Sequence, residues 1–116
     1  MPVSPLPFSP AVEANGFVFI SGQASVDKNG KIITDSFENE CRRSFENVGS
    51  ILKAAGLSFR DVLQVRNYVA NQEDLARFNE IYKEYFSEPY PARTTLIGCL
   101  GNLLKFEVDV VAFRKG

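Results

Sequence analysis

The chain has 116 residues, a common length for one domain, so we expect residues 1–116 to fold as a single domain. Its 13 Lys and Arg residues nearly balance its 14 Asp and Glu residues, and the net charge of -1 argues against the basic surface of a nucleic-acid-binding protein. The sequence contains no histidine, which excludes Ser-His-Asp and Cys-His nucleophile pairs and His-rich zinc sites.

Any chemistry must therefore come from arginine, carboxylates, hydroxyls, amides and bound water. Cys41 and Cys99 are too few and too far apart for a Cys-based zinc site, and the sequence has no GxxxxGK[ST] or GxGxxG loop to cradle a phosphate. We expect neither a metal nor a cofactor. Since no secretory-signal pattern and no run of about 18 apolar residues occur, we also expect a cytoplasmic protein that does not contact a membrane.

The N-terminal third of the chain predicts a β-hairpin. The apolar run from Gly16 to Gly22, GFVFISG, is typical of a short strand, and Asn29-Gly30 is a common two-residue turn. The segment KIIT would then be the partner strand, so that residues 17–34 form a hairpin or a meander.

A long helix is predicted over residues 35–55. Asp35 can cap its N-terminus, Glu38 would be the capping-box partner three residues later, and Gly56 is a natural stop. Apolar residues at helical spacing would form its buried stripe: Phe37, Cys41, Phe45, Val48, Ile51, Leu52 and Ala55. This spacing makes Cys41 a core thiol.

The next elements are a strand and a second helix. Residues 61–71 predict a strand in which Leu63, Val65 and Val69 share one side. Asn71 is placed to cap the helix that follows.

Two further strands are predicted over residues 92–98 and 104–113, joined as a tight hairpin at Gly101-Asn102, with Cys99 as a structural residue near a strand end. The order β-β-α-β-α-β-β predicts an α+β two-layer sandwich with both helices on one face of the sheet.

The second face of this sheet would carry Ile97 and Val111 beside Glu107 and Asp109. A face that is half apolar and half charged is typical of neither a dry core nor a fully solvated surface. We expect a subunit interface there.

Four polar residues interrupt the apolar pattern. Arg93 starts a strand behind Pro91, Glu107 lies within a strand, Asn79 lies on or beside the apolar face of the second helix, and Ser21 ends the first strand. Arg93 and Glu107 can simply face water, Asn79 can bond a backbone carbonyl, and Ser21 can belong to a turn. On their own these residues indicate a small α+β oligomer that binds an anion.

Four segments together carry a family resemblance. Residues 90–113, YPARTTLIGCLGNLLKFEVDVVAF, resemble the C-terminal signature of the Rid/YjgF family of reactive-intermediate deaminases, which is Pro-Ala-Arg, an apolar strand and then an apolar-Glu-apolar strand. GFVFISGQASVD resembles the family's N-terminal Ser-Gly-Gln segment. FENVGSILKAAGLSFRDVLQVRNYV and FNEIYKEYF resemble its first helix with the following strand and its second helix. The similarity runs from Pro7 to Phe113.

The resemblance implies a chorismate-mutase-like fold with a mixed sheet. It also implies a homotrimer in which the sheets form an inner barrel and three clefts lie between subunits. The implied activity is hydrolysis of 2-imino acids, such as 2-iminopropanoate and 2-iminobutanoate, to 2-keto acids and ammonia, with no metal or cofactor.

The resemblance also assigns roles to individual residues. Arg93 matches the arginine that holds the substrate carboxylate, and Glu107 matches the glutamate that holds the attacking water. Asn79, Ser21 and Gly22 match residues that line the same cleft.

Two site positions depart from the family pattern. Phe8 stands where close relatives have a tyrosine, which removes a hydroxyl. Thr95 stands where many members have a cysteine, although its backbone carbonyl can still hold a water. We expect both residues to contact substrate and to affect substrate range.

Two rival functions remain open. A deaminase of a larger dicarboxylic imine, such as 2-aminomuconate, would need a second cation near the cleft, for which Arg66 and Lys105 are the candidates. A trimer that binds small carboxylates without catalysis, for regulation, is the other. RNA cleavage is disfavoured by the pI of about 5.4 and the lack of a basic stripe.

Overall fold

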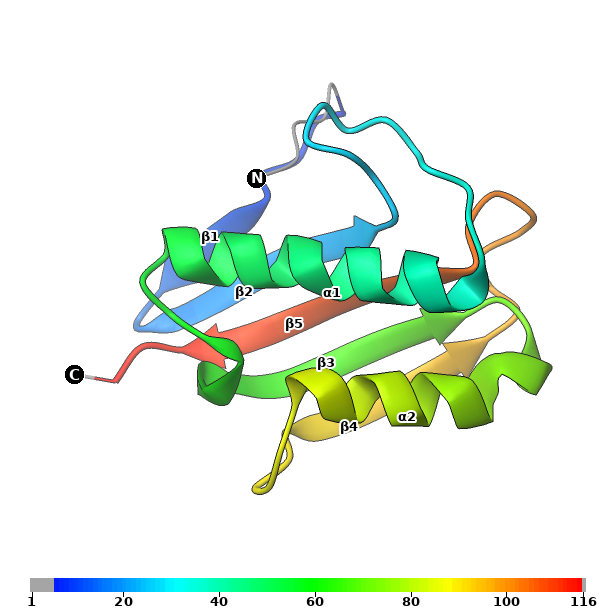
Figure 1. The fold of residues 1–116 in the computed structure, drawn as a ribbon. Coiled ribbons are helices and arrows are strands. Elements are labelled where there is room, and N and C mark those ends of the chain that lie inside the picture. Colours follow the sequence, from blue (N-terminus) through cyan, green and yellow to red (C-terminus); the bar gives the residue numbers. More distant parts are fainter. Residues whose placement is uncertain (1–5, 116) are drawn as a thin grey trace.

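The computed structural model describes residues 6–115, so the outermost residues of the predicted domain 1–116 lie outside it. Its main elements are β1 (Ala11–Ala14), β2 (Phe17–Ala24), α1 (Phe37–Ala54), β3 (Val62–Val69), α2 (Leu75–Tyr85), β4 (Ala92–Ile97) and β5 (Phe106–Phe113) (Figure 1). Short 3₁₀ turns, Phe59–Asp61 and Gln72–Asp74, precede β3 and α2.

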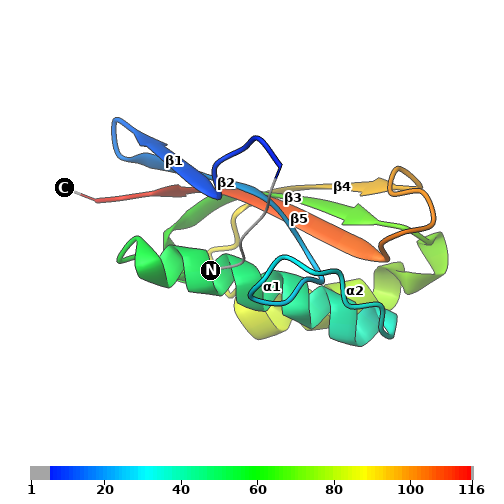
Figure 2. The ribbon, with the colours of Figure 1, turned by 90° about the horizontal axis from the view of Figure 1, so that it is seen from above.

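The strands form one sheet in the order β1-β2-β5-β3-β4. β3 and β4 run parallel, whereas all other neighbours are antiparallel, so the sheet is mixed. Both helices cover the same face (Figure 2). The predicted α+β two-layer sandwich and its element order are confirmed.

The N-terminus of α1 is capped by Ser36, so the prediction of Asp35 as its cap is wrong by one residue. The Ser36 hydroxyl accepts a hydrogen bond from the backbone N–H of Asn39, and Asp35 instead accepts from the backbone N–H of Ser36 at 2.7 Å. The predicted partner Glu38 takes no part in this cap; the carboxylate of Glu40 accepts from the backbone N–H of Asp35. Both Asp35 and Ser36 are residue types suited to capping, and sequence alone does not separate adjacent positions.

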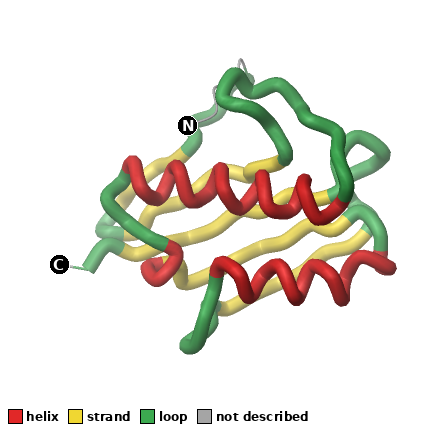
Figure 3. Tube along the Cα trace, in the orientation of Figure 1, coloured by secondary structure: helices red, strands yellow, loops and turns green. Residues whose placement is uncertain are grey.

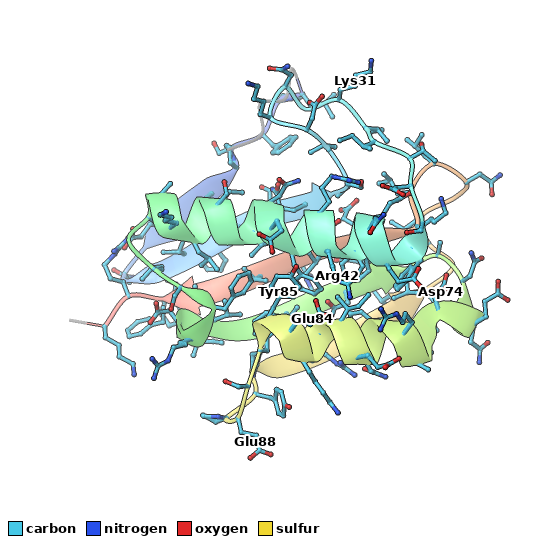
Figure 4. All side chains as sticks on the ribbon, viewed as in Figure 1. Lys31, Arg42, Asp74, Glu84, Tyr85 and Glu88 are labelled. Carbon is cyan, nitrogen blue, oxygen red and sulfur yellow. The ribbon has the colours of Figure 1, made fainter. Side chains whose placement is uncertain are left out.

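Two ion pairs join the helices, Arg42–Glu84 and Arg77–Glu38, and the first of them is bidentate. Arg42 of α1 donates to both carboxylate oxygens of Glu84 of α2, at 2.9 and 2.8 Å, and the two side chains meet between the helices in Figure 4. Below this pair the helices and the sheet enclose a core rich in aromatic rings, in which Phe45, Phe78 and Phe106 are fully buried. The ring centres of Phe45 and Phe106 are 5.4 Å apart. Cys41 lies in the same core, as expected.

The strand that pairs with β2 is not the predicted one. β1 pairs with β2 through a turn at Asn15-Gly16, where both residues have positive φ, 52° and 86°. The segment KIIT makes only an isolated bridge, from Ile32 to Val26, and the chain between β2 and α1 is loop in Figure 3. Asn15-Gly16 and Asn29-Gly30 both suit a tight turn. Only the first is flanked by two segments that pair as strands, β1 and β2.

The two C-terminal strands are not a hairpin, which corrects a second expectation. β3 lies between β4 and β5, and β4 runs parallel to β3. The segment with Gly101-Asn102 is therefore part of a loop that returns to the sheet across the end of β3, with positive φ at Gly98 and Gly101. A parallel arrangement places β4 at the edge of the sheet, beside α2.

Leu63 and Ile97 also lie on the opposite sides from those expected. The register of β3 shifts between Val62 and Gln64, so Val62 is buried and Leu63 is exposed. Ile97 pairs with the buried Val69, which places it on the helix-covered face. Val111 lies on the other face, as expected, because it alternates with buried residues of β5.

The face without helices exposes apolar side chains. Val12, Phe17, Phe19 and Leu96 are each between 39% and 57% exposed. No helix in the part of the chain covered by the structure is long and apolar enough to cross a membrane.

Candidate functional site

Arg93 lies on β4 at the edge of the sheet, on the face covered by α2. Its guanidinium carbon sits 4.8 Å from the ring centre of Tyr82 and 5.2 Å from that of Phe78. These cation–π contacts leave the N–H groups of Arg93 free of side-chain hydrogen bonds to residues 6–115. Arg93 is also an exposed residue of this single chain, as the interpretation that it faces water expects.

A cleft of about 550 Å³ opens over this guanidinium. Its lining residues are Asn79, Tyr82, Lys83, Tyr90, Pro91 and Arg93. None of them is acidic, and two are cationic. Asn79 makes no side-chain hydrogen bond to the described residues, so its amide can serve a ligand, as its predicted role requires.

Tyr82 forms the aromatic wall of the cleft. Burial raises the pKa of Tyr82 to about 12, although the positive charge of Arg93 acts in the opposite direction. The phenol is therefore neutral at physiological pH. Its buried hydroxyl has no hydrogen-bond partner within the described chain.

Thr95 lies two residues after Arg93, on the same side of β4, and pairs in register with Asn67 of β3. The Thr95 hydroxyl and both polar atoms of the Asn67 carboxamide are buried without a hydrogen bond to any described residue. Since buried polar groups are normally paired, these two adjacent side chains form an unusual polar spot under α2.

Glu107 lies elsewhere, on the face of β5 without helices. It alternates with the buried Phe106 and Val108, and its carboxylate covers Gly22, where an added Cβ would collide with it. Burial, and to a smaller extent the negative charge of Asp109, raises the pKa of Glu107 above its ordinary value. A carboxylate with raised pKa is a better proton acceptor.

Ser21 and Phe8 belong to the neighbourhood of Gly22. The Ser21 hydroxyl donates to the carbonyl of Ser9 at 2.6 Å, and the backbone N–H of Ser21 donates to the carbonyl of Pro10 at 2.9 Å. These bonds hold the N-terminal segment, with the half-exposed Phe8, against β2. The hydroxyl of Ser21 is thus engaged in a structural contact, although Ser21 lies within β2 and not in the turn that its simpler interpretation expected.

The predicted site residues therefore fall into two groups. Arg93, Asn79 and Thr95 lie together at the β4–α2 edge. Glu107, Gly22, Ser21 and Phe8 gather near β2 and β5. One chain does not bring the two groups together, because Arg93 and Glu107 occupy opposite faces of the sheet.

Sequence reasoning missed three cleft residues, Tyr82, Lys83 and Tyr90. Tyr82 fits the apolar face of α2, and its position three residues after Asn79 is the signal in the sequence that points to the cleft. Lys83 lies four residues after Asn79, on the same side of α2, and is a second cation beside Arg93 in the cleft.

The two cations proposed from sequence are already paired. Arg66 donates to Asp109 at 2.8 Å, and Tyr68 donates to the other oxygen of the same carboxylate. Lys105 donates to the buried carboxylate of Glu40 at 3.1 Å. Neither lines the Arg93 cleft.

No group of three His, Cys, Asp or Glu side chains in the described residues is placed to hold a metal ion. Cys41 is buried, and burial raises the pKa of its thiol, whereas Cys99 is exposed. Neither cysteine lines the cleft.

Comparison with known proteins gives consistent matches over nearly the whole chain. The model of the family described as Endoribonuclease L-PSP matches residues 1–114. A RutC family protein of Pyrococcus horikoshii is 37% identical over 111 residues, covering 94% of this chain and 88% of that protein. The human 2-iminobutanoate/2-iminopropanoate deaminase is 34% identical over 110 residues, covering 93% and 80%.

The similarity extends to three-dimensional structure. The crystal structure of RidA from the Antarctic bacterium Psychrobacter sp. superimposes with a TM-score of 0.88 at 30% identity, covering 97% of this chain and 92% of that one.

Proposed function

The chain belongs to the Rid/YjgF/L-PSP family, and on that premise we propose that it hydrolyses short 2-imino acids, such as 2-iminopropanoate and 2-iminobutanoate, to 2-keto acids and ammonia. The observation that carries the proposal is the guanidinium of Arg93, which has no acidic partner among residues 6–115 and lies over two aromatic rings in a cleft without an acidic lining residue.

In this proposal Arg93 binds the substrate carboxylate. A planar guanidinium presents paired N–H donors that match the two oxygens of a carboxylate, and such charge-assisted bonds contribute roughly 1.5–3 kcal/mol. The rings of Phe78 and Tyr82 limit the rotation of the guanidinium, so the adjacent C=N carbon of the substrate is placed at one position. Asn79 would bond a second polar atom of the substrate.

Glu107 would activate the water. As the water oxygen forms a bond to the C=N carbon, the π electrons move to nitrogen and Glu107 accepts a proton from the water. Glu107 then returns this proton to nitrogen, which gives an intermediate with a hydroxyl and an amino group on one carbon. Glu107 next takes the hydroxyl proton and delivers it to the amino nitrogen, so that the C–N bond breaks, the C=O bond forms and ammonia leaves. The backbone carbonyl of Thr95 would help to orient the water. General-base assistance of this kind contributes about 10²–10⁴-fold to the rate.

Two copies of the chain would be needed to complete one site. Arg93 and Glu107 lie on opposite faces within a single chain, so the Arg93 edge of one copy must meet the Glu107 face of another. The apolar side chains exposed on the face without helices support such packing. A homotrimer with three equivalent clefts satisfies this arrangement by closed rotational symmetry.

A ribonuclease is the second candidate, because the matching family model is described as an endoribonuclease. The near-equal numbers of basic and acidic residues and the small number of cations in the cleft argue against it. Incubation of the purified protein with labelled single-stranded RNA should give no cleavage above that of a matched buffer control.

The proposed activity is tested by competition with a chemical trap. A dehydratase acting on serine generates 2-iminopropanoate while semicarbazide traps it, and addition of the protein should lower the rate of semicarbazone formation. Arg93→Ala should abolish at least about nine-tenths of this effect. Arg60→Ala, which removes an exposed arginine outside the cleft, is the matched control and should behave like wild type.

Equal activity of wild type and Arg93→Ala would disprove the carboxylate role of Arg93. A protein that binds 2-oxobutyrate in titration but never lowers the rate of semicarbazone formation would be a carboxylate-binding protein instead of an enzyme.

A further inference from the structure

The Arg93 cleft holds a second cation, Lys83, that the proposed reaction does not use. Lys83 is an exposed residue of α2, one helical turn after Asn79, and both residues line the same cleft. A 2-imino acid with one carboxylate needs only Arg93. The role of the second positive charge is therefore open.

Lys83 has no acidic partner within the described chain. The nearest acids on the same helix are engaged elsewhere: Glu80 pairs with Arg77, and Glu84 pairs with Arg42. Since no lining residue of the cleft is acidic, the charges of Lys83 and Arg93 are both left for a ligand.

In the single chain, before a second copy closes over it, the cleft is also larger than a three-carbon or four-carbon ligand requires. Its volume of about 550 Å³ lies within the range of sites that take ligands of many more atoms. Its walls include Tyr82, Tyr90 and Pro91, which can contact the methylene groups of a longer substrate. A ligand that fills this space can meet Arg93 at one end and the flexible Lys83 at the other.

We propose that the preferred substrates are dicarboxylic 2-imino acids, with the carboxylate next to the imine on Arg93 and the distal carboxylate on Lys83. This inference rests on the proposed imine hydrolysis and names its substrate class. Lys83 acts as a specificity residue, because it contacts a part of the substrate that does not react.

Two five-carbon substrates that differ only at the far end test the inference. A flavin oxidase acting on D-glutamate supplies 2-iminoglutarate, and one acting on D-norvaline supplies 2-iminopentanoate, in each case with catalase and semicarbazide present. The wild-type protein should hydrolyse 2-iminoglutarate with the higher kcat/KM. Lys83→Met should lower kcat/KM for 2-iminoglutarate about fivefold and leave the value for 2-iminopentanoate unchanged.

Two further variants complete the design. Unlike Lys83→Met, Lys83→Arg should keep the preference for 2-iminoglutarate, because it keeps the positive charge. Lys53→Met removes an exposed lysine of α1 outside the cleft and should leave kcat/KM for both substrates unchanged. Equal effects of Lys83→Met on both substrates, or no effect on either, would overturn the inference.

Binding provides a readout that does not depend on turnover. In calorimetric titration 2-oxoglutarate should bind more tightly than 2-oxopentanoate, and Lys83→Met should remove the difference. Hydrolysis of 2-iminopentanoate alone, with no preference for 2-oxoglutarate in binding, would reject the inference and keep the proposed function. Tight, Lys83-dependent binding of 2-oxoglutarate without hydrolysis of either imine would reject the proposed function and keep the dicarboxylate site.

Discussion

Arg93 and Glu107 lie on opposite faces of one sheet. Arg93 aligns with the buried Val65 and stacks on rings of α2, whereas Glu107 lies between two buried residues of β5 and points away from the helices. Side chains on opposite faces of a sheet are separated by the backbone itself and do not reach one small molecule. If both act on the same substrate, they come from different copies of the chain.

The raised pKa of Glu107 predicts the acid side of the pH–rate profile. A general base acts only when deprotonated, so kcat/KM should fall as the pH drops through the pKa of Glu107, and burial places this fall above the ordinary range of glutamate. Asp109→Asn removes the negative charge that contributes to the shift, so the fall should move to lower pH. The measurement is the catalysed rate, corrected for spontaneous hydrolysis, in wild type and in this variant.

In Glu107→Gln the pH-dependent fall should disappear together with most of the turnover. A profile that is unchanged in both variants would show that another group titrates.

Gly22→Ala should displace the carboxylate of Glu107, the proposed base, while the fold is kept. The added methyl would occupy the space of the Glu107 carboxylate, which is the movable end of a side chain. We expect kcat to fall at least about tenfold, because misplacing a catalytic group by about 1 Å has effects of this order or larger. Thermal unfolding should remain close to that of wild type. A variant with full kcat would show that the carboxylate acts from another position.

Asn67→Leu should stabilise the folded state. The Asn67 carboxamide is fully buried, and neither of its polar atoms has a hydrogen-bond partner in the described chain. Replacing it with an apolar group of nearly the same shape removes a desolvation cost of about 1–3 kcal/mol. Denaturant unfolding at one fixed protein concentration measures the change, since assembly makes stability depend on concentration. A loss of stability would show that the carboxamide is satisfied in solution, for example by a bound water.

Much of the fold could be predicted because the local patterns were strong. The stripe of α1, from Phe37 to Leu52, is buried as the helical spacing required, and the alternation of β5 puts Phe106 and Val108 in the core. The family resemblance is likewise confirmed by the matches to the family model and to the human deaminase.

The errors concern choices that local patterns do not make. Two Asn-Gly pairs offered equivalent turns, and only the pairing of β1 with β2 favours the one at Asn15. The parallel pairing of β4 with β3 depends on contacts between distant segments, so the local pattern at Gly101-Asn102 predicts a hairpin where the structure has a loop. A register shift in β3 reversed the side of Leu63.

The site could be predicted only in part for a related reason. Resemblance supplied Arg93 and Glu107, but not the faces on which they lie. Lys83 has no pattern of its own, because a lysine on an exposed helix surface is ordinary. Lys83 becomes a candidate only in the folded chain, where β4 brings Arg93 to the same cleft.

Mixing two inactive variants tests the shared site most directly. Arg93→Ala copies keep Glu107, and Glu107→Gln copies keep Arg93. After equal amounts are unfolded together and refolded, about a quarter of the clefts should contain both wild-type residues, because half of the copies supply each one. The account predicts that about a quarter of the wild-type imine hydrolysis returns in the mixture, although each variant alone is inactive. A mixture as inactive as its components, with mixed oligomers confirmed by mass spectrometry, would contradict it.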